Sequence, residues 1–507
     1  MSTDFPVQEI VPELKQKLTQ HGVIILQAPP GAGKSTILPL QLLDEPWLVG
    51  KKIIMLEPRR LAARSVATRM ASLLDEAAGE TIGYRIRFEN CTSARTRIEV
   101  VTEGILTRMI QTDNSLDNVG LVIFDEFHER SLQADLALAL CLQVKELLRD
   151  DLRLLIMSAT LDGKLLSSLL NNAPIITSTG RQFPVTLNYI AVDQNSFLPI
   201  RMAKVIRKAL SENSGDILAF FPGAGEIQQT QELLEKENVS AIVHALYGDL
   251  TMKKQQEAIT PDAQGRRKIV LATSIAETSL TIEGITVVID SGYARVPRFD
   301  PRSGLTRLET IKVTLDAADQ RAGRAGRLGP GVCYRLWPEN SHHHLIPNRK
   351  PEILEADLAP LMLELSQWGV TDINELTWIT PPPAGAINQA KELLHQLDAL
   401  DHDRITARGK EMLRLPTHPR IAHMLLDSSK DKKRLALATD IASLLEERDP
   451  LEREAGADLS LRVELLRKWR DGQRTSVSRA AIERIERLAS AWRKQFSIAP
   501  DNTVVID

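Results

Sequence analysis

The feature that most constrains this chain is a glycine-rich stretch at residues 28–36, which reads Ala-Pro-Pro-Gly-Ala-Gly-Lys-Ser-Thr. It follows an apolar run at 23–26 and precedes a helix-compatible segment at 37–43. Strand, glycine-rich turn and helix together form a phosphate-binding loop, because backbone N–H groups and the helix N-terminus face the anion. The stretch therefore predicts an α/β fold with a nucleotide-phosphate site.

Individual residues of this stretch have distinct chemical roles. We expect Lys34 to reach the β- and γ-phosphates and the Ser35 hydroxyl to ligate Mg²⁺. One position departs from the usual pattern, because Ala28 stands where the first glycine is expected. On this motif alone, the alternative is a chance glycine-rich turn. The predicted nucleotide-binding residues of the loop are Ala28, Pro29, Pro30, Gly31, Ala32, Gly33, Lys34, Ser35 and Thr36.

Length and composition indicate a soluble protein of several domains. The 507 residues are enough for about three domains. The net charge of −3 means that any basic surface for nucleic acid must be local. Three cysteines without metal-site spacing fit a reducing compartment, and the first residues show no signal-peptide pattern. Because no apolar run approaches the ~20 residues of a membrane span, we expect a cytoplasmic protein.

From residue 23 to about 180, short apolar runs alternate with longer helix-period segments. This alternation predicts a parallel sheet covered on both faces, with ligands beyond the carboxyl ends of the strands. The polar ends of these runs should then lie along one edge, beside the phosphate loop. The predicted strands are 53–56, 98–101, 121–124 and 154–157, and the predicted helices are 61–76, 103–110 and 132–148.

A second α/β unit is predicted at residues 181–347, with a β-hairpin between 293 and 314. Its first strand ends in Pro222–Glu226, which repeats four letters of the phosphate loop but has Glu226 in place of Lys34. Two similar folds, one without its own nucleotide, would explain the repeat; coincidence is the alternative. The predicted strands of this unit are 217–221, 241–246, 268–272, 286–289 and 332–336.

After residue 350 the pattern changes to helices, and the run Pro381–Pro383 predicts a helix boundary. We expect domain divisions at 1–180, 181–347, 348–415 and 416–507. The predicted helices of the last two parts are 361–368, 388–397, 434–445, 461–469 and 478–496.

The sequence Asp125-Glu126-Phe127-His128 directly follows an apolar strand. There a carboxylate can face the metal held by Ser35. Asp125 is therefore predicted to bind Mg²⁺, and Glu126 to position and polarise the water that attacks the γ-phosphate. A pair of surface acids is the alternative, but the preceding apolar run disfavours it.

Three arginines separated by small residues form the next motif, Gln320-Arg321-Ala322-Gly323-Arg324-Ala325-Gly326-Arg327. Arginines three residues apart share a helix face. Arg324 and Arg327 can thus act as arginine fingers, which contribute about 10³–10⁵ in rate. A solvated basic helix is the alternative, although this segment offers no apolar face to bury.

In this order, these motifs resemble those of the superfamily-two DEAH-box helicases, and within them the bacterial HrpB-type helicases. Phe127 is a variation, because the family usually has alanine there. The resemblance covers residues 29–327 and implies two tandem RecA-like parallel-sheet domains. It also implies a mostly helical C-terminal region, with a winged-helix domain and a ratchet-like helical bundle. The implied catalytic residues are Glu126, Gln320, Arg324 and Arg327, and His128 joins the nucleotide-binding set.

The resemblance implies further contacts. The implied nucleic-acid contacts are Arg59, Thr102 and Thr273, the residues that couple hydrolysis to domain movement are Ser158 and Thr160, and Glu277 to Ser279 lie near the nucleotide. Arg69, with Arg64 as the competitor, matches the arginine that stacks on the base. Ile259 stands where relatives have an aromatic residue, so we expect weak discrimination among nucleotides.

The expected protein is an ATP-dependent, RNA-stimulated helicase that uses ATP, or other nucleoside triphosphates, with Mg²⁺. The family implies 3′ to 5′ movement and a monomer. Family members usually continue with further domains, which predicts a shortened chain here. The alternatives are the same motor on DNA, or a nucleotide-gated RNA clamp without unwinding. A metal at His342–His344 is disfavoured against a solvated loop, because no second cluster completes a site.

Overall fold

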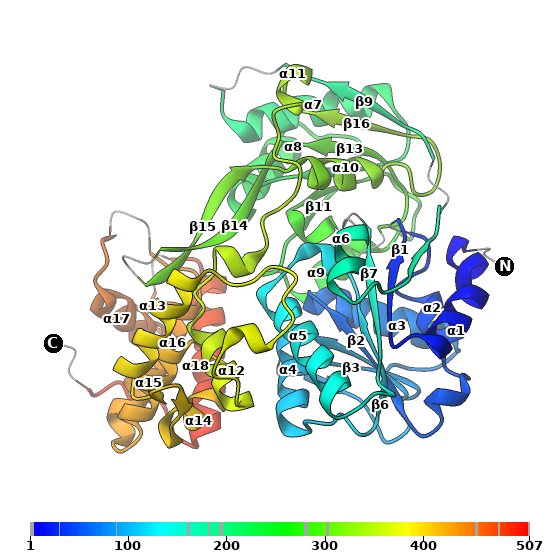
Figure 1. The fold of residues 1–507 in the computed structure, drawn as a ribbon. Coiled ribbons are helices and arrows are strands. Elements are labelled where there is room, and N and C mark those ends of the chain that lie inside the picture. Colours follow the sequence, from blue (N-terminus) through cyan, green and yellow to red (C-terminus); the bar gives the residue numbers. More distant parts are fainter. Residues whose placement is uncertain are drawn as a thin grey trace. The chain divides into compact units, whose positions relative to one another are not determined.

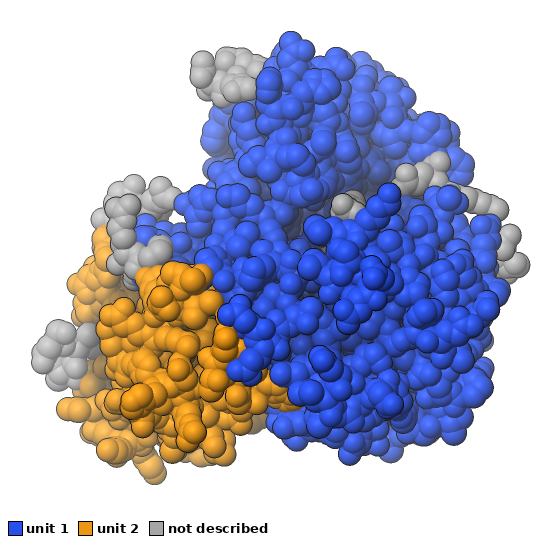
Figure 2. All heavy atoms as spheres, viewed as in Figure 1, with its two compact units in different colours: residues 1–357, 374–383 blue, residues 358–373, 384–507 orange. Residues whose placement is uncertain are grey.

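The computed structural model describes residues 5–29, 31–87, 89–159, 163–180, 183–191, 196–277, 282–300, 304–451, 455–474 and 477–504. Of the residues predicted above to have roles, Pro30, Thr160, Thr278 and Ser279 lie outside the described residues. The chain divides into two compact units (Figures 1 and 2). The first unit comprises residues 1–357 and 374–383, and the second comprises 358–373 and 384–507.

The first sheet of the first unit has eight strands in the order β4-β3-β5-β2-β6-β7-β1-β8. All neighbours are parallel except β3 and β4, which form an antiparallel edge pair. Every residue of β6 is buried, as its uninterrupted apolar sequence requires in a sheet covered on both faces. The strands are β1 (Val23–Gln27), β2 (Lys52–Glu57), β3 (Ile82–Ile86), β4 (Glu89–Cys91), β5 (Ile98–Thr102), β6 (Val119–Phe124), β7 (Arg153–Ser158) and β8 (Ile175–Thr177).

Alternate residues of these strands face different helices. Leu121 and Ile123 of β6 join a core that includes Leu14 of α1 and Val66 of α3, so these helices cover one face. Helix α5 is buried around most of its surface. The helices of this part are α1 (Val11–Gln20), α2 (Ile37–Gln41), α3 (Arg60–Leu73), α4 (Glu103–Thr112), α5 (Leu132–Leu147) and α6 (Gly163–Leu169).

The second sheet has six parallel strands in the order β11-β12-β10-β13-β16-β9. Its predicted strands are confirmed to within about two residues, and β9 is an edge strand that the sequence pattern did not reveal. The elements are β9 (Val185–Tyr189), α7 (Leu198–Glu212), β10 (Asp216–Phe220), α8 (Ala224–Lys236), β11 (Ile242–Leu246), α9 (Met252–Ile259), β12 (Lys268–Ala272), β13 (Ile285–Asp290), α10 (Leu315–Gly323), β16 (Gly331–Arg335) and α11 (Glu339–His342).

The predicted hairpin is confirmed. Its arms, β14 (Tyr293–Asp300) and β15 (Leu305–Lys312), pair antiparallel from Tyr293–Lys312 to Asp300–Leu305. Figure 1 shows both arms extending away from the second sheet. This two-stranded ribbon is a separate sheet, and its base continues directly into β13 and α10.

The second unit is helical, as predicted, with a small antiparallel strand pair. Asp440 of α16 is 1% exposed and binds Arg470 of α17 and Arg493 of α18. Its buried charge is thereby paired, and three helices are tied together. The elements are α12 (Ala359–Trp368), α13 (Ala384–Gln396), β17 (Leu400–Asp401), β18 (Arg404–Ile405), α14 (Ala407–Leu413), α15 (Pro419–Ser428), α16 (Lys432–Glu446), α17 (Leu459–Arg470) and α18 (Arg479–Phe496).

Among the described residues, no helix has the length and apolarity to cross a lipid bilayer. The same residues contain no cluster of three or more His, Cys, Asp or Glu side chains placed to hold a metal. His342 instead stacks on Trp337, with 6.4 Å between ring centroids.

Candidate nucleotide and nucleic-acid site

The carboxyl ends of the first sheet's strands meet at one edge, as the sequence predicted. Leu56 pairs with Phe124, Gln27 pairs with Ser158, and the edge continues through the end of β5. The N–H of Ala28 donates to the carbonyl of Ser158 at 3.2 Å. The phosphate loop is therefore bonded directly to the end of β7, where the coupling role was predicted.

The phosphate loop owes its path to two glycines. Gly31 and Gly33 have φ values of 85° and 90°, which residues with a side chain rarely adopt. A Cβ at Gly33 would lie 3.2 Å from Phe5 and Val7, whereas a Cβ at Gly31 would meet nothing within 4 Å. The loop is thus packed against the N-terminal segment on one side and open at Gly31, where an incoming phosphate needs space.

Lys34 lies at the centre of the site and is 3% exposed. Its Nζ is 3.0 Å from Oε1 of Glu126 and 3.3 Å from Oδ1 of Asp125. Burial alone would lower the pKa of Lys34, but the two carboxylates raise this pKa above its ordinary value. The three predicted residues are therefore together, and the lysine is charged.

The residues around Asp125 fit a divalent cation. One carboxylate oxygen, Oδ1, accepts the N–H of Glu126 at 2.8 Å, while Oδ2 is buried and has no hydrogen-bond donor among the residues that the structure describes. Such an oxygen is a ligand that Mg²⁺ prefers, and protein Mg²⁺ sites use one or two carboxylates together with substrate phosphates. Glu57, at the end of β2, is also fully buried, and burial followed by the charges of Asp125 and Glu126 raises its pKa well above the usual range.

Glu126 lies two residues after the end of β6 and has a left-handed conformation, with φ of 49°. Burial would raise its pKa, but Lys34 and then His128 lower it to about 2. The carboxylate is consequently ionised at neutral pH, which a group that orients and polarises water requires. His128 Nδ1 lies 3.4 Å from Oε2 of Glu126, and burial lowers the pKa of this histidine.

Phe127, the departure from the family pattern, has a structural role. Its ring is 1% exposed and packs edge-on against Phe124, with centroids 6.0 Å apart. The guanidinium of Arg130 lies over the other side, 5.9 Å from the ring centroid. The Phe127 side chain therefore fills space in the core beside Phe124.

The arginine motif begins on α10 but extends beyond it. The helix ends at Gly323, so Arg324 is the C-cap and Arg327 follows in an irregular turn; the expectation of one shared helix face is therefore wrong. Both guanidinium groups nevertheless interact electrostatically with Glu126 of the first sheet. Burial lowers the pKa of Arg327 to about 10, and burial and then Arg327 lower the pKa of Arg324. Arg324 is buried and Arg327 is half-buried, so the two cations create a local preference for an anion.

Gln320 and His128 line the same narrow cleft. The residues around it come from both sheets of the first unit. The remaining lining residues are Arg59, Glu129, Glu277, Asp316, Ala317 and Arg349. The structure thus brings together four of the predicted site residues with several that the sequence did not single out.

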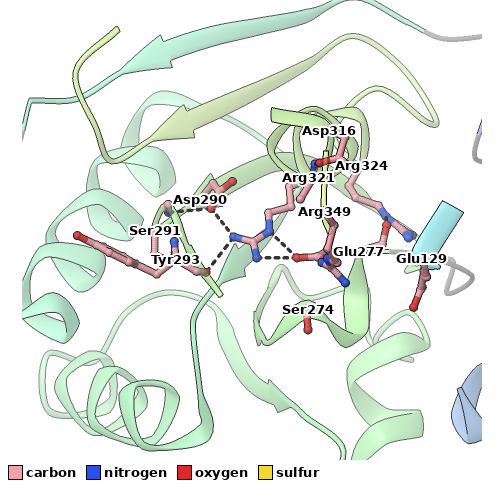
Figure 3. A network of polar contacts seen from close by, with 12 residues as sticks. Glu129, Ser274, Glu277, Asp290, Ser291, Tyr293, Asp316, Arg321, Arg324 and Arg349 are labelled. Atoms are coloured by element: carbon pink, nitrogen blue, oxygen red, sulfur yellow. Dashed lines mark hydrogen bonds and ion pairs between the residues drawn. The ribbon is translucent and has the colours of Figure 1, made fainter. Parts of the chain in front are cut away.

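The middle arginine of the motif, Arg321, was not assigned a role from sequence. It is fully buried and donates to Glu277 at 2.6 and 2.8 Å, to Asp290 at 2.6 Å and to the carbonyl of Tyr293 at 3.2 Å (Figure 3). Arg324 donates through Nε to the Glu277 carbonyl at 3.0 Å. Arg321 therefore fixes Glu277, a finger residue and the hairpin base relative to one another. The spacing of the arginines alone gives no sign of these distant partners.

The predicted nucleic-acid contacts lie at the ends of strands. Thr102 ends β5, and Thr273 directly follows β12. Arg59 is half-buried and donates to the Ser274 carbonyl at 2.5 Å and to Glu129 at 3.1 Å. Since Arg59 already joins segments of both sheets, its contact with a strand phosphate stays a prediction.

The two candidates for the base-stacking arginine differ in their surroundings. Arg64 pairs with Glu89, and its guanidinium lies 5.7 Å from the Tyr84 ring centroid. Arg69 is exposed on α3. Ile259, at the end of α9, packs against an apolar core cluster. The greater freedom of Arg69 favours it over Arg64, and its stacking role stays a prediction.

The segment Pro222–Glu226 repeats four letters of the phosphate loop, but α8 already begins at Ala224, so Glu226 lies in the first turn of this helix. Glu226, in the position equivalent to Lys34, binds Arg295 of the hairpin at 3.0 Å. A Cβ at Gly223 would lie 2.2 Å from the Arg295 guanidinium. A cation from the chain itself thus lies against this segment, which supports the interpretation of a second lobe without its own nucleotide.

Comparison with known proteins identifies two family domains. Residues 6–168 match the family described as DEAD/DEAH box helicase, and residues 201–329 match the helicase conserved C-terminal domain. The first match contains Lys34, Asp125 and Glu126. The second contains Gln320, Arg324 and Arg327.

Individual relatives agree with this result. The chain is 51% identical over 446 residues to the ATP-dependent RNA helicase HrpB of Escherichia coli, covering 88% of this chain and 55% of that protein. It is 33% identical over 431 residues to the ATP-dependent RNA helicase HrpA of Borreliella burgdorferi, covering 83% of this chain and 52% of that protein. The chain therefore spans about half the length of these curated relatives.

Two solved structures are also similar. A crystal structure described as the E. coli DEAH/RHA helicase HrpB superposes with a TM-score of 0.86 at 46% identity, covering 98% of this chain and 61% of that one. A second, described as the E. coli DExH-box NTPase HrpB, gives a TM-score of 0.81 at 46% identity, with coverages of 99% and 60%.

Proposed function

Because this chain belongs to the DEAD/DEAH box helicase family, we propose that it is an ATP-dependent RNA helicase whose two RecA-like domains share one nucleotide. One observation carries the proposal. A buried cluster of Lys34, Asp125 and Glu126 on one sheet interacts with Arg324 and Arg327 from the other. Each half contains part of a hydrolytic site, and neither half contains all of it.

In this proposal the chain's own residues divide the work of hydrolysis. The loop backbone and Lys34 bind the triphosphate, and Lys34 exchanges its carboxylate partners for phosphate oxygens. Glu126 orients the attacking water, with His128 beside it. Arg324 and Arg327 neutralise the charge that develops on the transferred phosphoryl group. When bound through Asp125 and Ser35, Mg²⁺ would supply further charge neutralisation at the phosphates.

The residues proposed to contact the polynucleotide lie at or near the carboxyl ends of the strands. Arg59, Thr102 and Thr273 are proposed to bind strand phosphates, which gives affinity without reading sequence. Ser158 is proposed to couple hydrolysis to movement, and its carbonyl bond to Ala28 supports this role. If the two domains bind the strand alternately, movement proceeds in steps. The proposed direction, 3′ to 5′, is the one that the family implies.

RNA is the proposed track because the two curated relatives are named RNA helicases. The functional divisions we propose are RecA-like domains at 1–180 and 181–347, a winged-helix-like domain at 348–415 and a ratchet-like domain at 416–507. The two separate sheets support the division between 1–180 and 181–347. The helices with the small β17–β18 pair support the winged-helix-like domain at 348–415. The protein is proposed to act as a cytoplasmic monomer, where its three free cysteines would stay reduced.

ATP hydrolysis measured without polymer, with single-stranded RNA and with single-stranded DNA tests this proposal. We expect RNA to stimulate turnover and a strand-displacement assay to show duplex unwinding. Stimulation by DNA alone would instead select the same motor on a DNA track. Binding of RNA that depends on nucleotide, without stimulation or unwinding, would identify a clamp.

Replacing Glu126 with glutamine tests the hydrolytic assignment. The amide keeps the shape of the carboxylate but cannot polarise water as an anion, so we expect turnover to fall by about 10²–10⁴-fold. ATP binding should persist, because the loop backbone and Lys34, which are proposed to bind the triphosphate, are unchanged. Rapid-quench hydrolysis and equilibrium binding of a fluorescent ATP analogue measure the two quantities. Near-normal hydrolysis would remove Glu126 from its role.

A further inference from the structure

The segment that follows the second sheet, residues 349–355, contacts three functional parts of the first unit. We call it the strap. It includes a turn of 3₁₀ helix, Glu352–Leu354, and its central side chain, Ile353, is fully buried. The strap is therefore anchored by an apolar side chain, while its polar groups reach outward to both sheets and to the hairpin.

At its start, the strap contacts Glu277. Arg349 donates to Oε2 of this carboxylate at 3.1 Å, while Oε1 accepts from Arg321 (Figure 3). The backbone carbonyl of Glu277 holds the finger Arg324. Glu277 is 2% exposed, and the neighbouring arginines hold its pKa below the usual value against the effect of burial. Arg349 thus contacts the residue that orients the finger.

At its centre, the strap binds the loop that follows Glu126. The carboxylate of Glu352 accepts the N–H of Leu132, the first residue of α5, at 2.9 Å. The N–H of Glu352 donates to the carbonyl of Arg130 at 3.0 Å. Arg130 has φ of 49°, as does Glu126. Conformations of this kind cost energy and persist only where the surroundings hold them.

At its end, the strap binds the hairpin. The carbonyl of Glu355 accepts the N–H of Phe299 at 3.4 Å, and its carboxylate is 3.3 Å from Arg298. Both partners lie on β14. A seven-residue segment therefore connects the finger side of the hydrolytic site, the loop of its water-orienting carboxylate and the hairpin.

We infer that the strap couples nucleotide hydrolysis to the hairpin, with Arg349 and Glu352 as positioning residues that act through Glu277 and the 126–132 loop. The inference rests on the proposed helicase function. Two discrete contacts are needed because the two halves of the hydrolytic site belong to different sheets, and each contact fixes one half relative to the same short segment. A shift of either half must then move Glu355 and its partners on β14.

The test compares four variants with the unaltered chain. Glu352→Ala removes the acceptor for the Leu132 N–H, whereas Glu352→Gln keeps an acceptor oxygen and should restore function. Arg349→Ala removes the contact with Glu277, which Arg321 still holds, and so provides a second variant if Glu352→Ala folds poorly. Glu283→Ala, at an exposed carboxylate of the second lobe, is the matched control.

Two independent measurements are made on each variant. RNA-stimulated ATP hydrolysis gives kcat and the KM for ATP, and hydrogen exchange followed by mass spectrometry reports on residues 126–132 and 293–300 without requiring activity. For Glu352→Ala and Arg349→Ala, we expect kcat to fall by about 5-fold or more, the lower bound of usual coupling effects. KM should change less than 2-fold, as a rough limit, because neither residue contacts the nucleotide-binding loop.

The exchange pattern distinguishes coupling from a local defect. Glu352→Ala should speed exchange in both segments, the 126–132 loop and the hairpin arm, and Glu352→Gln should resemble the unaltered chain. Faster exchange confined to 126–132, or no change in either segment, would overturn the proposed coupling through the strap. An unaltered chain without RNA-stimulated hydrolysis would instead overturn the proposed function, and the exchange data would still decide whether the strap connects the two segments.

Discussion

Arg324→Ala is expected to lower the RNA-stimulated turnover of ATP by about 10³-fold or more, the range for loss of an arginine finger. The guanidinium is 4% exposed, interacts with Glu126 and is oriented by the Glu277 carbonyl. In the ground state this cation is expensive to bury, so its presence is best explained by the negative charge that develops during hydrolysis. RNA affinity should change little, because Arg324 lies beside Glu126 and is not among the residues proposed to bind strand phosphates.

Steady-state hydrolysis and fluorescence anisotropy with labelled RNA measure the two effects. Arg324→Lys retains the charge but loses the planar fork and the fixed geometry, so it should recover only part of the rate. Arg266→Ala is the matched control, since Arg266 is an exposed arginine of the same lobe that pairs with Asp262. Turnover within 10-fold of normal in Arg324→Ala, with an unchanged melting temperature, would contradict the shared-site arrangement.

Lys34→Ala is expected to abolish nucleotide binding and to destabilise the nucleotide-free protein. Without the ammonium, Asp125 and Glu126 are left as adjacent buried carboxylates. Breaking a buried pair in this way costs about 3–5 kcal/mol. Adding Glu126→Gln removes one of the stranded charges, so the double variant should be more stable than Lys34→Ala, although still unable to bind ATP. Thermal melting and ATP titration measure stability and binding.

The pH dependence of stability gives a further check on the Lys34→Ala variant. In the unaltered chain, Lys34 and His128 overcome burial and lower the pKa of Glu126 to about 2 from 4.5. Ionised Glu126 therefore contributes stability above pH 4.5 that is lost as the pH falls towards 2. Without Lys34, the largest effect that lowers the pKa of Glu126 is lost, so this pKa rises and the stability gained between pH 2 and 4.5 should become smaller. A melting temperature that changes with pH as in the unaltered chain would contradict the buried pair.

Much of the fold could be predicted because long apolar runs leave few alternatives. The run Leu121–Phe124 lies in a strand that is buried on both faces, so every residue of the run is apolar and indicates a buried strand. By contrast, β3, β4 and β9 are edge or near-edge strands. β9 has no fully buried residue, and exposed Leu187 interrupts any alternation that would have revealed it. The antiparallel direction of β4 depends on its partner, which local sequence does not specify.

The candidate site was predictable to the level of residue types but not of partners. Strand ends in a parallel sheet converge, so Lys34, Asp125 and Glu126 could be placed together from spacing alone. Arg59 could not be placed, because a half-buried arginine can reach a phosphate, a carbonyl or a carboxylate with equal ease. The contacts of Glu352 were also invisible, since Leu132 lies 220 residues earlier in the chain.

The segment Pro222–Glu226, which repeats four letters of the phosphate loop, bears on the stoichiometry of the proposed motor. Its Glu226 pairs with Arg295 of the hairpin at the position that Lys34 occupies in the phosphate loop. One chain would then consume a single ATP per cycle, with no second hydrolytic event to keep in phase with the first. The timing of movements of the two lobes would depend on mechanical linkage within the polypeptide rather than on communication between two nucleotide-binding sites.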